Sequence, residues 1–387
     1  MSRISKQIYT APKDLKLLWV AAFSLYVGFG IYSACAPNFA TEILHIKPMQ
    51  IGFLEAVREL PGFLCVGIAA LTMSIAEPIV GAVAVLLTAG GIGAYAIING
   101  VPSLLVYSFI WSTGLHTWMP LSSSLTLNLA KDDDKGARLG QTAGVGSLGS
   151  LLGMAIVMNW AHALSYQVWF VMAACLIVMA VFILFTLRRD IGHGNKPRMV
   201  WKPKYRRYYI LSLLEGGRKQ VFFTFAPYTL TKIYHEPLKT MAMLMVINGI
   251  VNMIGAPYIG RLIDRIREKK ILMVSYTSLI GVFLCYGLIH HASILCVLYC
   301  LDNLIYLSTN CLTTYVQRIA SSEDLMPTLS MGVTMNHVAA VSVPLIGGFL
   351  WSRFSYPIMF YAGGIVVVIS LIFVTTMNVG KPVRAEA

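Results

Sequence analysis

The apolar residues of the chain fall into twelve long runs, which are separated by shorter polar segments. A helix needs about 20 mainly apolar residues to cross the hydrocarbon core of a membrane. Measured against that length, the runs predict twelve spanning helices, at residues 16–37, 48–72, 78–98, 102–129, 139–161, 165–187, 207–232, 239–260, 271–289, 292–317, 327–350 and 356–378. The sequence therefore predicts an all-α, multi-pass integral membrane protein.

Composition and charge agree with a membrane protein. Of the 387 residues, 57% are hydrophobic and only 12% are charged, whereas a soluble domain carries about 25% charged residues. The net charge of +13 does not indicate nucleic-acid binding, because no soluble basic domain is left to carry it. Lys and Arg concentrate in the tails and in alternate connections, which predicts that both termini are cytoplasmic. We expect insertion in a bacterial cytoplasmic (inner) membrane, in contact with its lipids.

Two stretches of the chain match each other at a constant offset of 190 residues. One stands at the end of the first apolar run, and the other stands at the end of the seventh, which is the first run of the second half. The five matching pairs are Ala36 and Ala226, Pro37 and Pro227, Thr41 and Thr231, Ile43 and Ile233, and His45 and His235. Repeat architecture is common in transporters. The match therefore predicts two six-helix bundles, residues 1–187 and 207–387, joined by a basic cytoplasmic linker, residues 188–206. A helix-exit turn favoured by Pro in both places is the alternative explanation.

Residues 260–270, Gly-Arg-Leu-Ile-Asp-Arg-Ile-Arg-Glu-Lys-Lys, resemble the signature loop of the major facilitator superfamily. That signature is Gly-x-Leu-x-Asp-Arg with a basic cluster, between the second and third helices of a half. The resemblance implies the twelve-helix major facilitator fold and a transporter. It also implies a conformational gating role for Gly260, Asp264 and Arg265, in contacts that hold the outward-facing state and break as the protein opens inward. The corresponding loop of the first half, residues 71–78, lacks the signature.

Charged residues interrupt two of the apolar runs in the same pattern. Glu55, Arg58 and Glu59 stand at i, i+3 and i+4 in the second run, so they share one helix face. The seventh run repeats this spacing with three further charged residues, Glu215, Arg218 and Lys219. Ionisable groups are costly inside a membrane, so they should face the protein interior or a water-filled cavity. Counting residues from the ends of the runs predicts that these groups lie near the middle of the membrane, where repeat transporters bind their substrates.

Two interpretations of these charges stay open. They could line a translocation path, where Arg binds carboxylate or phosphate groups through its fixed fork and a desolvated carboxyl group exchanges protons. On this interpretation the substrate-binding candidates are Arg58, Arg218, Lys219, His337, Asp302 and His116, and the proton-coupling candidates are Glu59, Glu55 and Glu215. Alternatively, the charges are mutual ion pairs that fix the packing of the helices.

These features predict a secondary active transporter that moves a small solute, an organic anion, by proton-coupled alternating access. The alternative is a polyspecific exporter of drugs and amphipathic compounds, working as a proton antiporter, which the aromatic residues and 19 Met favour. Pro344, Gly347 and Gly348 resemble the Pro-x-x-Gly-Gly motif of exporters, but they lie in the eleventh run and not in the fifth. An enzyme is not expected, since the sequence shows no catalytic arrangement and no nucleotide-binding loop. No cofactor or metal is expected, and we expect a monomer.

Overall fold

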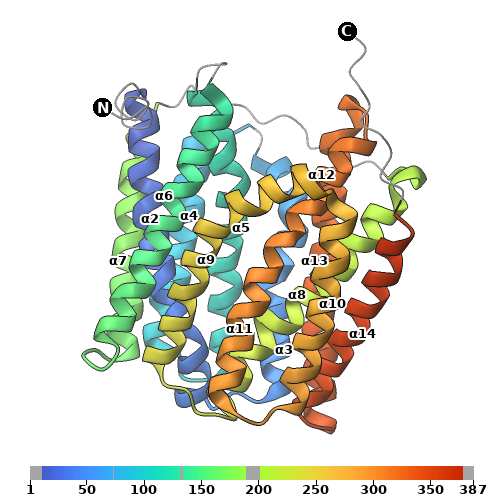
Figure 1. Cartoon of the computed structure of the whole chain (residues 1–387). Helices are drawn as coiled ribbons and strands as arrows, with labels where there is room; N and C mark the ends of the chain where they lie inside the picture. Colours follow the sequence, from blue (N-terminus) through green and yellow to red (C-terminus); the bar gives the residue numbers. More distant parts are fainter. Residues whose placement is uncertain (1–10, 73, 131–133, 189–200, 378–387) are drawn as a thin grey trace. The chain divides into compact units, whose positions relative to one another are not determined.

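A computed structural model of the protein describes residues 11–72, 74–130, 134–188 and 201–377 (Figure 1). Every regular element in these ranges is helical. The α-helices are α2 (Lys13–Asn38), α3 (Pro48–Thr72), α4 (Glu77–Gly93), α5 (Val101–Leu129), α6 (Lys135–Trp160), α7 (Tyr166–Phe185), α8 (Arg206–Lys232), α9 (Leu238–Ile266), α10 (Glu268–Leu288), α11 (Ala292–Tyr306), α12 (Asn310–Ile319), α13 (Ser322–Arg353) and α14 (Pro357–Thr375). Short helical turns extend some of them, at Phe39–Ile43, Ala94–Ile97, Pro203–Tyr205 and Leu307–Thr309.

Each of the twelve predicted ranges is helical, with α11 and α12 forming one of them through the turn at Leu307–Thr309. Within the described residues, nine helices are long and apolar enough to cross a membrane. Of the remaining long helices, α3 and α8 carry the charged triplets, and α5 is rich in Ser and Thr. The all-α prediction is therefore confirmed, while the number of twelve spans and the cytoplasmic side of the termini stay predictions.

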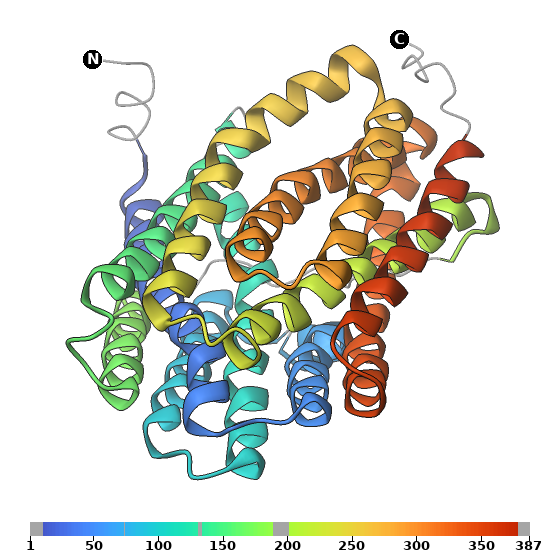
Figure 2. The ribbon, with the colours of Figure 1, turned by 60° about the horizontal axis from the view of Figure 1, so that its bottom comes forward.

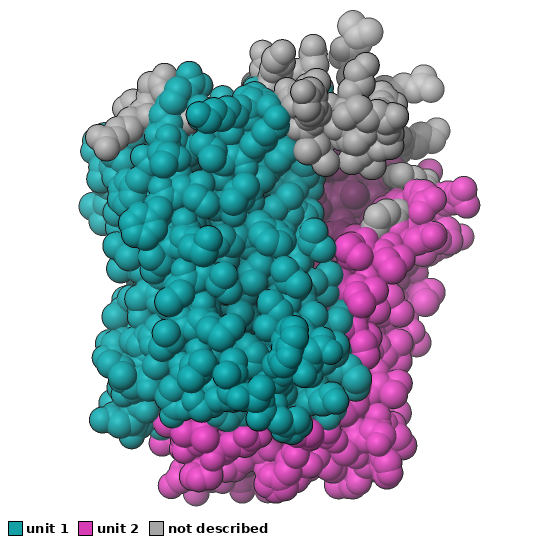
Figure 3. Space-filling model, turned by 90° about the vertical axis from the view of Figure 1, so that its left-hand side faces the viewer, with its two compact units in different colours: residues 1–39, 64–196, 238–246 teal, residues 40–63, 197–237, 247–387 magenta. Residues whose placement is uncertain are grey.

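The chain forms two compact units, which Figure 3 colours separately. Unit 1 comprises residues 1–39, 64–196 and 238–246, in which α2 packs against α6 and α7, and α4 packs against α5 and α7. Glycines allow α6 to approach α2 closely: a Cβ on Gly149 would lie 2.7 Å from the carbonyl oxygen of Phe23. Small residues of this kind allow the backbones of membrane helices to come together.

Unit 2 comprises residues 40–63, 197–237 and 247–387. Here α8 packs against α13 and α14, and α10 packs against α14 and α11. The helices α3 and α9 each contribute residues to both units. The two units do not follow the predicted boundaries, so the division into two six-helix bundles stays a prediction. Most of the predicted linker, residues 188–206, lies outside the described residues.

The two matching stretches of the sequence end their helices with the same backbone geometry. His45 and His235 both have positive φ angles, 48° and 54°. The next residue in each copy, Ile46 or Glu236, donates its backbone N–H across the turn to a carbonyl six residues back, at 3.0 Å in both. In both copies a left-handed residue therefore stands at the end of the helix. The resemblance seen in sequence therefore extends to the local fold.

The stretch that resembles the signature loop is mostly helical. We expected the helix to end near Gly260, but α9 continues to Ile266, and Arg267, with a φ of 74°, is the single residue between α9 and α10. Figures 1 and 2 show α9 running directly into α10. The charged residues that mark the end of the apolar run do not end the helix, because a helix can continue into water beyond the membrane.

Candidate substrate and proton site

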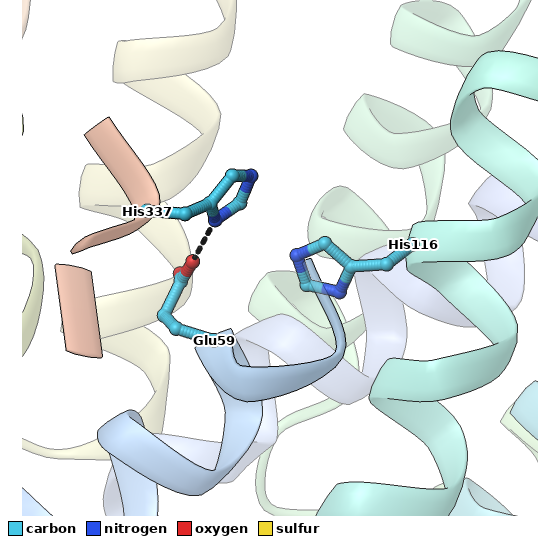
Figure 4. A group of neighbouring side chains, drawn as sticks. All are labelled: Glu59, His116 and His337. Atoms are coloured by element: carbon cyan, nitrogen blue, oxygen red, sulfur yellow. Dashed lines mark hydrogen bonds and ion pairs between the residues drawn. The ribbon is translucent and has the colours of Figure 1, made fainter. Parts of the chain in front are cut away.

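A cluster of charged side chains joins α3 to α13 inside unit 2. The guanidinium of Arg58 donates a hydrogen bond of 2.5 Å from Nη1 to Oε1 of Glu55, as the i, i+3 spacing predicts. One turn along the same face, Oε2 of Glu59 lies 3.0 Å from Nδ1 of His337 on α13 (Figure 4). The structure thus brings together four of the predicted site residues.

Close packing of small residues sets these two helices opposite each other. Gly52, two turns before Glu59 on α3, lies against the backbone of Pro344, which is two turns after His337 on α13. A Cβ on Gly348 would lie 2.6 Å from the carbonyl oxygen of Pro48. The helices therefore run antiparallel in close contact, which aligns Glu59 with His337. The stretch that resembles an exporter motif provides this contact.

The side chains of the cluster are partly accessible. Exposed fractions are 15% for Arg58, 19% for Glu55, 21% for Glu59 and 19% for His337. The protein therefore encloses these four side chains only in part. The charge of Glu59 also acts on Glu55. The four residues therefore interact electrostatically, either directly or through a neighbour.

The second charged cluster, around Arg218 of α8, is enclosed. Arg218 is 0% exposed, and it binds Glu215 through two hydrogen bonds, the one from Nε being 3.1 Å long. Its Nη1 lies 3.5 Å from Oδ1 of Asp302 on α11, which is 6% exposed. Tyr276 of α10 and Thr309 also donate hydroxyl hydrogen bonds to Glu215, of 3.1 and 2.9 Å.

This enclosure distinguishes the cluster around Arg218 from the cluster of α3 and α13. Glu215 accepts hydrogen bonds from Arg218, Tyr276 and Thr309, so its carboxylate is saturated with donors from α8, α10 and the turn after α11. Such an arrangement is typical of a network that fixes helix packing. For Arg218 and Glu215 it favours the packing interpretation over contact with a solute.

The remaining predicted site residues make other contacts. Lys219 is half-buried, with Nζ 5.0 Å from the centre of the Phe223 ring. His116, which Figure 4 also labels, belongs to unit 1, where its Nδ1 lies 3.0 Å from the hydroxyl of Ser112. The gating candidates Gly260 and Arg265 are exposed in the last turns of α9, and the side chain of Asp264 lies outside the description.

Sequence reasoning missed the polar contacts between the ends of the helices. Arg318, at the end of α12, donates a hydrogen bond of 2.6 Å to the buried Glu268 at the start of α10. The neighbouring Lys269 donates to the carbonyl of Thr375 at the end of α14, at 2.6 Å. Acidic residues favour helix starts and basic residues favour helix ends, and this rule could have singled out Glu268 and Arg318.

A second cluster of this kind ties the end of the linker to the start of α13. Asp324 accepts hydrogen bonds from Lys202 at 2.5 Å, Lys204 at 2.8 Å and Tyr205 at 2.9 Å. These bonds, that of Lys202 first, hold the pKa of the Asp324 carboxyl well below its usual range. The same contact with Asp324 raises the pKa of Lys204.

Comparisons with known proteins agree with this fold. The sequence model of the Major Facilitator Superfamily matches residues 18–330 and also residues 208–386. Among solved structures, the nucleoside transporter NupG has a TM-score of 0.79 at 14% identity, over 95% of this chain and 100% of that chain. A bacterial homologue of the human lysosomal transporter Spinster, in an inward-facing and occupied conformation, has a TM-score of 0.72 at 11% identity, over 93% of this chain and 95% of that one. A search of curated proteins found no match.

Proposed function

Because the chain belongs to the Major Facilitator Superfamily, we propose that it is a secondary active transporter that moves a small organic anion by alternating access, driven by protons. The family and the apolar helices make it an integral, multi-pass membrane transporter and not an enzyme. The contact between Glu59 and His337 carries the proposal for proton coupling, since it is a partly exposed hydrogen bond between two titratable groups on different helices.

Protonation of this pair changes a contact between helices. With Glu59 ionised, its carboxylate accepts a hydrogen bond from His337 and attracts a charged imidazole. Adding a proton to Glu59 removes that charge. The interaction between α3 and α13 then weakens, because hydrogen bonds to charged groups are about twice as strong as neutral ones. Proton binding would in this way be linked to a change in the packing of the two helices, which is what coupled transport needs.

Arg58 is the group that we propose for solute recognition. Its fork already binds one carboxylate, that of Glu55, and a carboxylate or phosphate of a solute would compete for the same nitrogens. Glu55 released from Arg58 would then be free to accept a proton. Substrate and proton would therefore depend on each other through four neighbouring side chains of α3 and α13.

The alternative functions differ in what supports them. The Pro-x-x-Gly-Gly resemblance lies at the contact of α13 with α3, and helix packing accounts for it without export. The nucleoside transporter shares the fold at an identity too low to transfer its substrate, so nucleosides enter as test compounds beside organic anions.

Uptake into proteoliposomes tests the proposal. The panel comprises carboxylates, sugars, nucleosides and cationic dyes, each with and without an imposed pH gradient. We expect uptake of at least one organic anion that the gradient accelerates, and a loss of anion uptake of tenfold or more in Arg58→Gln, since the change removes a charged hydrogen-bonding group (about 1.5–3 kcal/mol). Glu42→Gln, a change of charge at an exposed residue, serves as a control. Transport of dyes without transport of anions would replace this proposal with the exporter.

A further inference from the structure

Unit 1 contains a cavity that the charged cluster does not involve. It lies among α2, α5 and α6 and has a volume of about 450 Å³. Pockets for small molecules measure about 300–1,000 Å³, so the cavity has the size of a small solute. The residues that give it its chemistry are Tyr26, Phe29, Ser122, Ser123, Ser147 and Ser150.

The serines of this cavity are free to bind a solute. Within the described part of the chain, the hydroxyls of Ser122, Ser123, Ser147 and Ser150 form no hydrogen bond with the protein. Other hydroxyls of α5 differ, since Thr113 donates to the carbonyl one turn before it, at 2.7 Å. Four unbonded hydroxyls would be costly against lipid. They therefore indicate a space that water or a polar solute fills.

One wall of the cavity is aromatic. Tyr26 and Phe29 stand at i and i+3 on α2, and both line the cavity. The position of the Tyr26 ring requires a glycine at residue 146 of α6, because a Cβ on Gly146 would lie 2.9 Å from the ring. Glycine at this position makes room for the aromatic side chain beside the serines.

The lining excludes several occupants by its charge and polarity. None of the residues that line the cavity is charged, so neither an anion nor a cation would find a counter-ion among them. A purely apolar occupant would leave the serine hydroxyls without partners. An uncharged group with hydroxyls fits this lining, because each serine hydroxyl can donate and accept a hydrogen bond. Such a group should also present an apolar ring face to Tyr26 and Phe29.

We propose that this cavity binds an uncharged ring that carries hydroxyl groups, such as a glycosyl group. The inference rests on the proposed function, because it concerns the class of solute that the transporter binds.

Binding of three probes to the purified protein, measured by calorimetry, separates the two assignments. Glucose carries the ring alone, succinate the anionic groups alone, and glucuronate both. We expect glucose and glucuronate to bind roughly tenfold more weakly to the double variant Ser123→Ala/Ser147→Ala, since it removes two hydrogen bonds, while succinate binds as before. Ser278→Ala/Ser352→Ala, which changes two exposed serines outside the cavity, should bind all three probes like the wild type.

A second variant tests the cavity by filling it. Ala143 lines the cavity and is exposed, so Ala143→Phe should abolish binding of glucose and glucuronate without the loss of any hydrogen bond. A wild-type protein that binds neither sugar, or sugar binding that both variants leave unchanged, overturns the inference, and proton-driven succinate uptake would then still support the proposed function. Sugar binding that depends on the serines, with no transport of any anion, supports the cavity and overturns the anion assignment.

Discussion

At the scale of single residues, what distinguishes the two charged triplets is how far water reaches them. The same i, i+3, i+4 spacing occurs in α3 and α8, and sequence alone predicted that each triplet shares one helix face. It could not predict that Arg218 is fully enclosed and that Arg58 is not, because the enclosing groups come from other helices. Tyr276 and Asp302 are distant from Arg218 in sequence, and of the two only Asp302 was a candidate for the same site.

Loss of Arg218 should therefore affect the fold more than loss of Arg58. Arg218→Gln leaves Glu215 and Asp302 buried without their counter-charge, and breaking such a pair costs about 3–5 kcal/mol. We expect a clearly lower melting temperature in detergent for Arg218→Gln, and a value near that of the wild type for the partly exposed Arg58→Gln. Equal melting temperatures for the wild type and Arg218→Gln would contradict the packing role.

At the scale of the helices, sequence predicted positions well and ends less well. Apolar length found all twelve helical ranges, but it ended one helix at Gly260, where α9 continues for more than a turn. The ion pairs that fix the helix ends, such as that of Glu268 with Arg318, had no signal in the apolar pattern. By contrast, the two positions that share a left-handed turn, His45 and His235, had already been matched in sequence.

The contact of Asp324 with the end of the linker has a defined pH dependence. Its carboxyl has a pKa below the usual range in the folded protein. Such a group stabilises the fold above its unfolded pKa, about 4, and the contribution is lost as the pH falls through the lowered value. We expect Asp324→Asn to lower the melting temperature equally at all values from about pH 5 to pH 8.

The difference between Asp324→Asn and the wild type should shrink only below about pH 4, as the wild-type carboxyl becomes protonated. Thermal unfolding followed by intrinsic fluorescence, in one detergent across the pH series, measures it. The exposed Glu42→Gln, which lies outside this contact, controls for a general effect of removing a carboxylate. A difference that vanishes already near neutral pH would show that the lysines do not hold the charge of Asp324.

At the scale of the whole molecule, the composition and the length of the apolar runs were enough to predict a membrane protein, and one short motif pointed to the family. The side chains that give the molecule its chemistry were only partly visible. Glu59 and His337 were both candidates, but their contact depends on the packing of Gly52 against Pro344. The serine-lined cavity had no sequence signal, since hydroxyls in apolar helices usually bond to their own backbone.

The central claim is that Glu59 and His337 couple solute movement to proton movement. The most direct test records the internal pH of proteoliposomes with a trapped indicator dye while the transported solute is added outside. We expect the wild type to show a solute-dependent pH change that a protonophore abolishes, and Glu59→Gln to bind the solute without that change. Solute movement with no pH change in the wild type, or an unchanged pH response in Glu59→Gln, would contradict the account.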